Sequence, residues 1–268
     1  MRGNSFLNYK IKHSSFAKKS LGQNFLNDFL VAKNMCEALT IENKIVLEVG
    51  PGTGFLTRGI INHKPKKLIL IEKDRRLIST LRKNFGELAE IINTDALKLD
   101  VSEVSKAEKQ KITIISNLPY NIGTTLVLNW LNDIDYIEDI VVMLQKEVVD
   151  RICASPKTKD YGRISILIQS ICDVKKLFDV KPECFNPKPK VMSSIVKITP
   201  KHSNKIDKYT FRTLDKICKI AFSQRRKKLS NVFKNTDLYK ILNEDIIDKR
   251  AEELSVEEYI QLSNVYDK

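Results

Sequence analysis

The sequence predicts an α/β protein in which a doubly wound parallel sheet is followed by a small α-helical domain. Apolar runs of strand length alternate with amphipathic runs of helix length through the first half of the 268 residues. A glycine-rich turn follows one of these apolar runs, and apolar residues keep a helical spacing from Tyr209 onward. Alternating strands and helices form parallel sheets, which bind ligands at the carboxyl ends of their strands.

The expected strands are short runs of Val, Ile and Leu, which pack well in a buried sheet. They cover residues 45–49, 68–71, 91–92, 112–115 and 140–144. The expected helices follow turn or capping residues and carry apolar residues at helical spacing. One is capped by Asn27 or Asp28 and runs to about Leu39, and the others cover 55–61, 74–85 and a stretch that ends near Leu131.

The second half of the chain is organised differently. Residues 182–190 are too rich in proline for a helix or a central strand, so we expect a shaped loop. A strand at 191–198 follows, and the polar stretch 200–207 is typical of a linker between domains. The expected domains are a basic N-terminal arm at 1–19, a Rossmann-like domain at 20–200 and a helical domain at 201–268.

Glycine or polar residues stand at the ends of four expected strands. They are Gly50, Glu72, Asp95 and Asn117. Because the carboxyl ends of parallel strands meet at one edge of a sheet, these residues converge although they are far apart in the sequence.

The formal charge of +13 is unevenly distributed. Lys18 and Lys19 belong to an N-terminal block without acids, and a second such block spans 219–228. Blocks of this kind attract nucleic acid through counterion release. The simpler alternative is a solvated basic face that aids solubility.

Several classes of protein are not indicated. No run approaches the roughly 18 apolar residues of a membrane span, and the N-terminus lacks the features of a signal peptide. The five cysteines show no C-x-x-C pairing and the three histidines lie far apart. We therefore expect neither a disulfide framework nor a metal site.

The glycine-rich turn at 48–54 reads Glu-Val-Gly-Pro-Gly-Thr-Gly. The dinucleotide pattern G-x-G-x-x-G would need glycine at Phe55, so a pyrophosphate is not expected. An adenosine without phosphates suits the turn, and S-adenosyl-L-methionine fits best. Gly50 would allow close approach of the methionine part, Glu72 would accept from the ribose hydroxyls and Asp95 from the adenine amino group. Taken alone, the glycines could form an ordinary tight turn.

Residues 117–120, Asn-Leu-Pro-Tyr, can hold an amino group on a flat ring. The Asn117 side chain and the Leu118 carbonyl can accept two N–H bonds, Pro119 fixes the turn and Tyr120 offers a face for stacking. Accepting both N–H bonds of an adenine amino group would favour a pyramidal nitrogen whose lone pair points at a methyl donor. The alternative is an Asx-Pro turn with a packed tyrosine.

These motifs together resemble the ribosomal RNA adenine N6,N6-dimethyltransferase family. The resemblance rests on residues 22–26, 48–54, 117–120, 144–148, 161–163 and 185–193. The segment 222–229 resembles the KsgA type, which acts on small-subunit rRNA. Ser116 departs from the pattern, since glycine or alanine commonly precedes the asparagine.

The resemblance implies functions for particular residues. Cofactor contacts would fall on Asn24, Leu26, Gly50, Gly52, Glu72, Asp95, Ala96 and Asn117. The target base would meet Asn117, Leu118, Pro119 and Tyr120, with Phe185 on the opposite face. RNA contacts are expected from Lys18, Lys19, Lys188, Lys190, Arg225, Arg226, Lys227 and Lys228.

The expected function is S-adenosylmethionine-dependent dimethylation of two adjacent adenosines near the 3′ end of small-subunit rRNA. The expected partner is the assembling small ribosomal subunit. We expect a monomer in the bacterial cytoplasm that does not bind a membrane. A ribosome-assembly or transcription factor that acts by binding, and a large-subunit rRNA or DNA adenine methylase, remain alternatives. The basic residues 1–19 could also be a mitochondrial transit peptide.

Overall fold

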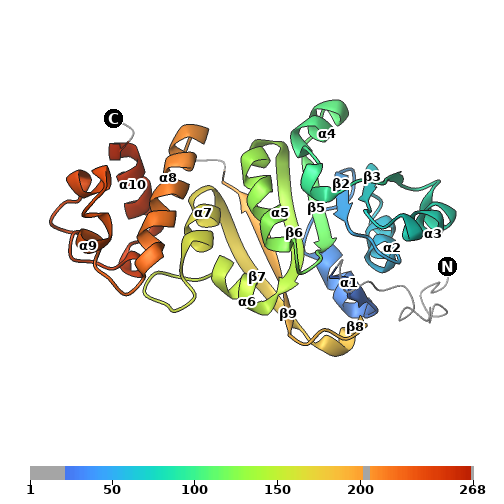
Figure 1. Cartoon of the computed structure of the whole chain (residues 1–268). Helices are drawn as coiled ribbons and strands as arrows, with labels where there is room; N and C mark the ends of the chain where they lie inside the picture. Colours follow the sequence, from blue (N-terminus) through green and yellow to red (C-terminus); the bar gives the residue numbers. More distant parts are fainter. Residues whose placement is uncertain (1–21, 202–205, 267–268) are drawn as a thin grey trace. The chain divides into compact units, whose positions relative to one another are not determined.

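The computed structural model (Figure 1) describes residues 22–201 and 206–266, which fall into two compact units. The first unit comprises residues 22–146 and 177–197, and the second comprises the remaining described residues. The chain thus passes from one unit to the other more than once.

Most of a seven-stranded sheet with the order β4-β3-β2-β5-β6-β9-β7 belongs to the first unit. The neighbouring strands from β4 to β6 pair in parallel, which confirms the predicted α/β class. Their bounds are β2 Ile45–Val49, β3 Lys67–Ile71, β4 Glu90–Ile92, β5 Ile112–Asn117 and β6 Ile137–Gln145. The last two strands are β7 Cys172–Val180 and β9 Ser193–Pro200. A separate two-stranded sheet joins β1 (Phe25–Leu26) to β8 (Phe185–Asn186) in antiparallel register.

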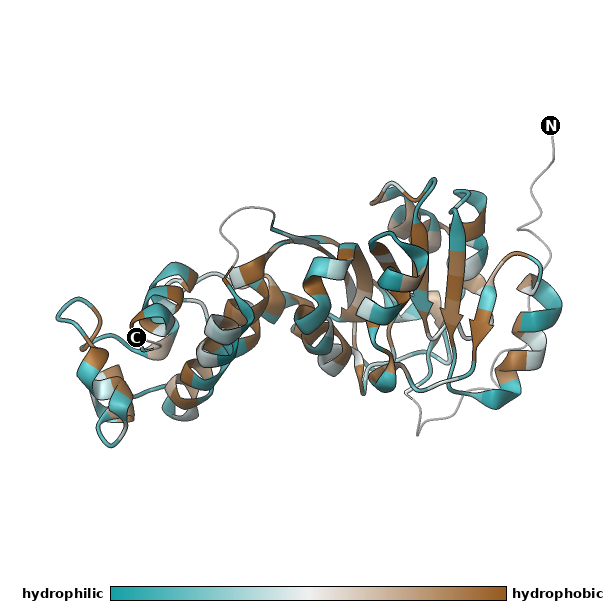
Figure 2. Ribbon diagram, turned by 90° about the horizontal axis from the view of Figure 1, so that it is seen from above, coloured by the Kyte–Doolittle hydropathy of each residue, from teal (hydrophilic) through white to brown (hydrophobic). Residues whose placement is uncertain are grey.

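Capping residues set where several helices of this unit begin. The Asp28 side chain accepts a hydrogen bond from the Val31 N–H, Asp74 accepts from Arg76, and Asp100 accepts from Ser102 and Glu103. The helices are α1 Phe29–Glu37, α2 Phe55–Asn62, α3 Arg75–Phe85, α4 Val101–Glu108 and α5 Gly123–Trp130. Figure 2 shows hydrophobic colouring along the strands and hydrophilic faces on the helices, as expected for a sheet buried between helices.

The second unit is helical. It contains α7 (Arg163–Ile171), α8 (Lys208–Ala221), α9 (Leu229–Phe233) and α10 (Val256–Tyr266), and α6 (Lys146–Ile152) begins at its boundary. Helices α7 and α10 pack against α8. The ring of Phe222 lies 6.1 Å from that of Tyr259 and 6.5 Å from that of Tyr161. No helix within residues 22–201 and 206–266 has the length and apolarity needed to cross a bilayer.

The division into units differs from the sequence prediction at residues 147–176. The prediction placed them in the first domain, because the polar linker after residue 200 was the visible boundary. In the structure α7 buries an apolar face against α8, and Arg163 of α7 forms an ion pair with Asp215 of α8. A linker marks where a chain crosses between units, but it does not show that an earlier segment belongs to the later unit.

Candidate active site

The glycine-rich turn between β2 and α2 leaves bare backbone in front of the sheet. Gly52 has a φ of +59°, in the left-handed region that glycine adopts without strain. A Cβ atom at Gly52 would lie 2.8 Å from the ring of Phe25. The Gly52 N–H donates a 3.2 Å hydrogen bond to Oε2 of Glu72, which ties the turn to the end of β3.

Glu72 follows β3 and is almost fully buried. Its Oε1 accepts a 2.7 Å hydrogen bond from the Asp74 N–H, while Oε2 accepts the one from Gly52. Burial raises the pKa of the Glu72 carboxyl, and the hydrogen bonds from the two amides work in the opposite direction. Because each carboxylate oxygen can accept two hydrogen bonds, both can still accept from the hydroxyl groups of a ligand.

Asp95 lies after β4 and carries an ion pair that the sequence did not suggest. Its Oδ2 is 2.7 Å from Nζ of Lys73, and its Oδ1 accepts a 3.1 Å hydrogen bond from the Leu97 N–H. The Lys73 ammonium is the main cause of the lowered pKa of the Asp95 carboxyl. Asp95 is therefore an ionised acceptor at neutral pH.

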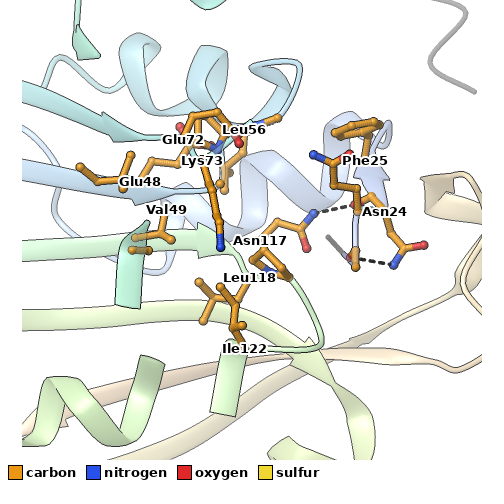
Figure 3. Close-up of a pocket in the computed structure, with 18 of the residues that line it drawn as sticks. Asn24, Phe25, Glu48, Val49, Leu56, Glu72, Lys73, Asn117, Leu118 and Ile122 are labelled. Atoms are coloured by element: carbon orange, nitrogen blue, oxygen red, sulfur yellow. Dashed lines mark hydrogen bonds between the residues drawn. The ribbon is translucent and has the colours of Figure 1, made fainter. Parts of the chain in front are cut away.

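The amide of Asn117 is held in one orientation at the end of β5. Its Nδ2 donates a 3.1 Å hydrogen bond to the Asn24 carbonyl, as the dashed line in Figure 3 shows. No atom of the described chain donates a recorded hydrogen bond to its Oδ1. The carbonyl side of this amide is thus the part that can accept from a ligand.

The turn after Asn117 is fixed by backbone hydrogen bonds. The Leu118 N–H donates to the Met143 carbonyl on β6, and the Pro119 carbonyl accepts from both Ile122 and Gly123. The Tyr120 hydroxyl is hydrogen-bonded to the Ser193 hydroxyl. Backbone and side-chain bonds therefore hold the whole four-residue segment.

The glycine turn, Glu72, Asp95 and residues 117–120 line one cavity at the carboxyl edge of the sheet (Figure 3). The predicted site residues among its lining are Asn24, Leu26, Gly50, Gly52, Glu72, Asp95, Ala96, Asn117, Leu118, Pro119 and Tyr120. Acceptors for hydroxyl and amino groups thus share the space with the bare backbone of the glycine turn.

The chain is similar to one family over almost its full length. Residues 14–268 match the family described as Ribosomal RNA adenine dimethylase. The chain belongs to this family. A protein of Wolbachia sp. subsp. Drosophila simulans (strain wRi), called Ribosomal RNA small subunit methyltransferase A, is 40% identical over 259 residues, or 92% of each chain. A protein of the same name from Pelagibacter ubique (strain HTCC1062) is 44% identical over 220 residues, covering 81% of this chain and 82% of that one.

A solved structure supports the same relationship for the fold. The crystal structure of a dimethyladenosine transferase from Plasmodium falciparum matches with a TM-score of 0.79 and 27% sequence identity, covering 91% of this chain and 97% of that chain. As a ribosomal RNA adenine dimethylase, the protein is an enzyme that transfers methyl groups from S-adenosyl-L-methionine to adenine in rRNA. The predicted family, activity and cofactor are confirmed, and a factor that acts by binding alone is not favoured.

The cavity of this dimethylase fits its cofactor. Glu72 and Asp95 provide two carboxylates at neighbouring strand ends, suited to the ribose hydroxyls and the adenine amino group. At Gly52 a side chain would meet the Phe25 ring, so the turn presents only bare backbone at this point of the cavity. The residues present therefore match an adenosine that carries no phosphate.

Phe185 does not lie where the sequence analysis expected it. Its side chain is only 3% exposed and packs in the hydrophobic core, and it is not among the residues that line the cavity. The cause is the pairing of β8 with β1, which places Phe185 opposite Leu26. Stacking of this ring on a target base would require it to leave the core.

The predicted RNA-binding residues fall into different groups. Arg225 is engaged within the second unit, pairing with Glu252 and donating to the Lys159 and Thr158 carbonyls at 2.5 and 2.9 Å. Lys228 pairs with Asp248, and Lys188 pairs with Glu183. Arg226, Lys227 and Lys190 are exposed and form no recorded ion pair with the described chain. Lys18 and Lys19 lie outside the described residues.

Two cavity residues were missed by the sequence analysis as parts of the site. Lys73 follows Glu72 directly, and this position next to an expected site residue was the signal in the sequence that could have identified it. Glu48 is buried on β2 and accepts a 2.7 Å hydrogen bond from the Thr57 hydroxyl. Burial raises its pKa to about 8. An acid within a run of buried apolar residues was the signal for Glu48.

Proposed function

We propose that this enzyme dimethylates N6 of two adjacent adenosines near the 3′ end of small-subunit rRNA, during assembly of that subunit. Relatives that are 40 to 44% identical over most of the chain carry the name Ribosomal RNA small subunit methyltransferase A, which supports this choice of subunit. We further propose that it acts in the cytoplasm as a monomer.

The observation that carries the proposal is the orientation of the Asn117 amide. Because Nδ2 is bound to the Asn24 carbonyl, Oδ1 would be the atom that accepts from a ligand in the cavity. An adenine amino group is a poor nucleophile, since its lone pair is delocalised into the ring. Acceptance of its N–H groups by Asn117 Oδ1 and the Leu118 carbonyl would favour the pyramidal nitrogen that attacks.

The other cavity residues would place the two reactants. When bound, S-adenosyl-L-methionine supplies a methyl group on a sulfonium. Glu72 would bind the ribose hydroxyls, Asp95 would accept from the adenine amino group, and the Gly50 and Gly52 backbone would adjoin the methionine part. Tyr120 would stack on the target base and hold its nitrogen in line with the methyl group. Asn24, Leu26 and Ala96 would complete the walls around the cofactor.

The helical second unit would contact rRNA. Arg226 and Lys227 are the members of the basic segment whose charges remain available to phosphates, and Lys190 offers another in the first unit. We propose the same role for Lys18 and Lys19 in an N-terminal arm at 1–19. Lys188 and Lys228 would have to exchange an exposed carboxylate partner for a phosphate.

A methyl-transfer assay tests the proposal. Purified protein is given labelled cofactor and undermethylated small or large subunits, and the modified nucleotides are mapped by mass spectrometry. We expect dimethyladenosine at two adjacent positions of the small-subunit rRNA alone. Asn117→Ala should abolish transfer, whereas Asn132→Ala, at an exposed asparagine outside the cavity, should not. Label in the large subunit only would contradict the proposed substrate.

A further inference from the structure

The Tyr120 hydroxyl is anchored outside the cavity. Tyr120 lines the cavity and is partly buried, while its hydroxyl forms a short hydrogen bond with the fully buried Ser193 hydroxyl. Ser193 is not among the residues that line the cavity. It therefore holds the ring at its hydroxyl end without lining the cavity itself.

Ser193 is itself firmly held. It is the first residue of β9, which lies next to β6 in the sheet. The preceding Met192 carbonyl accepts a 2.9 Å hydrogen bond from the Lys146 N–H, and the following Ser194 hydroxyl donates to Asp179 at 2.6 Å. The turn that carries Tyr120 is tied to the same strand β6 through Leu118 and Met143. The segments that carry Tyr120 and Ser193 are thus both hydrogen-bonded to β6 or to the residue that follows it.

A hydrogen bond at the hydroxyl end of a tyrosine fixes the direction of the ring axis, because the hydroxyl oxygen moves whenever the side chain rotates about χ1. Without such an anchor the whole ring can swing between χ1 rotamers, and only one of these places it against a base in the cavity. Burial also raises the pKa of Tyr120, so the phenol stays neutral and keeps its proton at neutral pH. The hydrogen bond between the two hydroxyl groups is therefore intact at neutral pH.

We propose that Ser193 is a positioning residue for methyl transfer, because its hydroxyl holds the Tyr120 ring at the place in the cavity where the target adenine stacks. This inference rests on the proposed function, in which Tyr120 contacts the base. It also gives a role to the end of the segment 185–193, which resembled the family but had no assigned chemistry.

Four variants test the inference in the methyl-transfer assay on small subunits. Ser193→Ala and Tyr120→Phe each remove one hydroxyl, and each should lower kcat/KM about fivefold, the effect of one lost hydrogen bond. The double variant should lose no more than either single variant, because both changes break the same bond. Ser193→Thr keeps a hydroxyl and should restore most of the activity.

Ser194→Ala is the matched control, since it removes a buried serine hydroxyl from the next position of the same strand. It should lower thermal stability about as much as Ser193→Ala and leave kcat/KM unchanged. Binding of S-adenosylhomocysteine should be equal in all variants. Wild-type kcat/KM in Ser193→Ala, or losses that multiply in the double variant, would overturn the inference. If the wild type methylates only large subunits, the proposed substrate is wrong, and the variants are compared on that RNA.

Discussion

The Thr57 hydroxyl donates a 2.7 Å hydrogen bond to Oε2 of Glu48 beneath the glycine turn. Both side chains are buried, with exposed fractions of 0% and 1%. Burial raises the pKa of Glu48 to about 8, and the hydrogen bond from Thr57 offsets only part of this. At neutral pH the carboxyl is therefore protonated while the fold is intact.

This predicts that Glu48 makes the fold less stable as pH rises. The Glu48 carboxyl ionises near pH 4.5 in the unfolded chain and near pH 8 in the folded protein. The contribution of the neutral carboxyl to the free energy of unfolding is therefore fully present below pH 4.5 and is lost as pH rises to 8. The slope within this window is about 1.4 kcal/mol per pH unit. Between pH 5 and 7, Glu48→Gln should therefore gain about 2 to 3 kcal/mol relative to the wild type in urea unfolding. If the free energies of unfolding of the two proteins changed in parallel with pH, the Glu48 carboxyl would not be protonated in the folded protein.

Arg225 and Arg226 are neighbours that should respond differently to substitution. Arg225→Met removes the bonds to Glu252, Lys159 and Thr158, and should cost about 1 to 3 kcal/mol of stability. Arg226→Met combined with Lys227→Met should leave the melting temperature unchanged. It should reduce the slope of log affinity for rRNA against log salt by about 2, because two phosphate contacts are lost. Equal melting temperatures for the wild type, Arg225→Met and the variant with Arg226→Met and Lys227→Met would argue against a structural role of Arg225.

Lys73 should protect Asp95 from protonation. The ammonium keeps the Asp95 pKa lowered, so the carboxylate persists to a lower pH than it would alone. Its contribution to ligand binding is present at neutral pH and is lost as pH falls through the lowered pKa. In Lys73→Met, the acid-side loss of S-adenosylhomocysteine affinity should move to higher pH, as measured by calorimetry from pH 4 to 7. Lys98→Met, at a lysine that is also near Asp95, is the control and should shift the profile less.

The two glycines at the front of the turn should tolerate alanine unequally. Both have a positive φ, so each substitution strains the backbone by about 1 kcal/mol. At Gly52 the new methyl group would also meet the Phe25 ring at 2.8 Å, whereas at Gly50 the nearest atom, in Pro119, is 3.5 Å away. Gly52→Ala should therefore weaken S-adenosylhomocysteine binding about tenfold more than Gly50→Ala, from an added cost of about 1 to 2 kcal/mol. Equal affinities of the two variants for S-adenosylhomocysteine would show that the Phe25 ring moves aside at no cost.

The sequence predicted the parallel strands and the cavity because both follow from local patterns. Runs such as 68–71 are uniformly apolar, and polar residues at the ends of such runs meet wherever strands are parallel. It did not predict β7 (Cys172–Val180), in which only the first and last residues are buried and no apolar run stands out. It also did not predict the core packing of Phe185 or the ion pair of Arg225. Their partners, Leu26 and Glu252, are distant in the sequence, and such pairings leave no local pattern.

The hydrogen bond from Asn117 to the Asn24 carbonyl also sets which bases the site can reject. With Nδ2 turned toward the Asn24 carbonyl, the amide presents its Oδ1 acceptor to the ring edge of a base. Guanine and hypoxanthine carry a carbonyl oxygen where adenine carries its amino group, and two facing acceptors repel. Discrimination would then come from the polarity of one fixed amide, without any difference in pocket size.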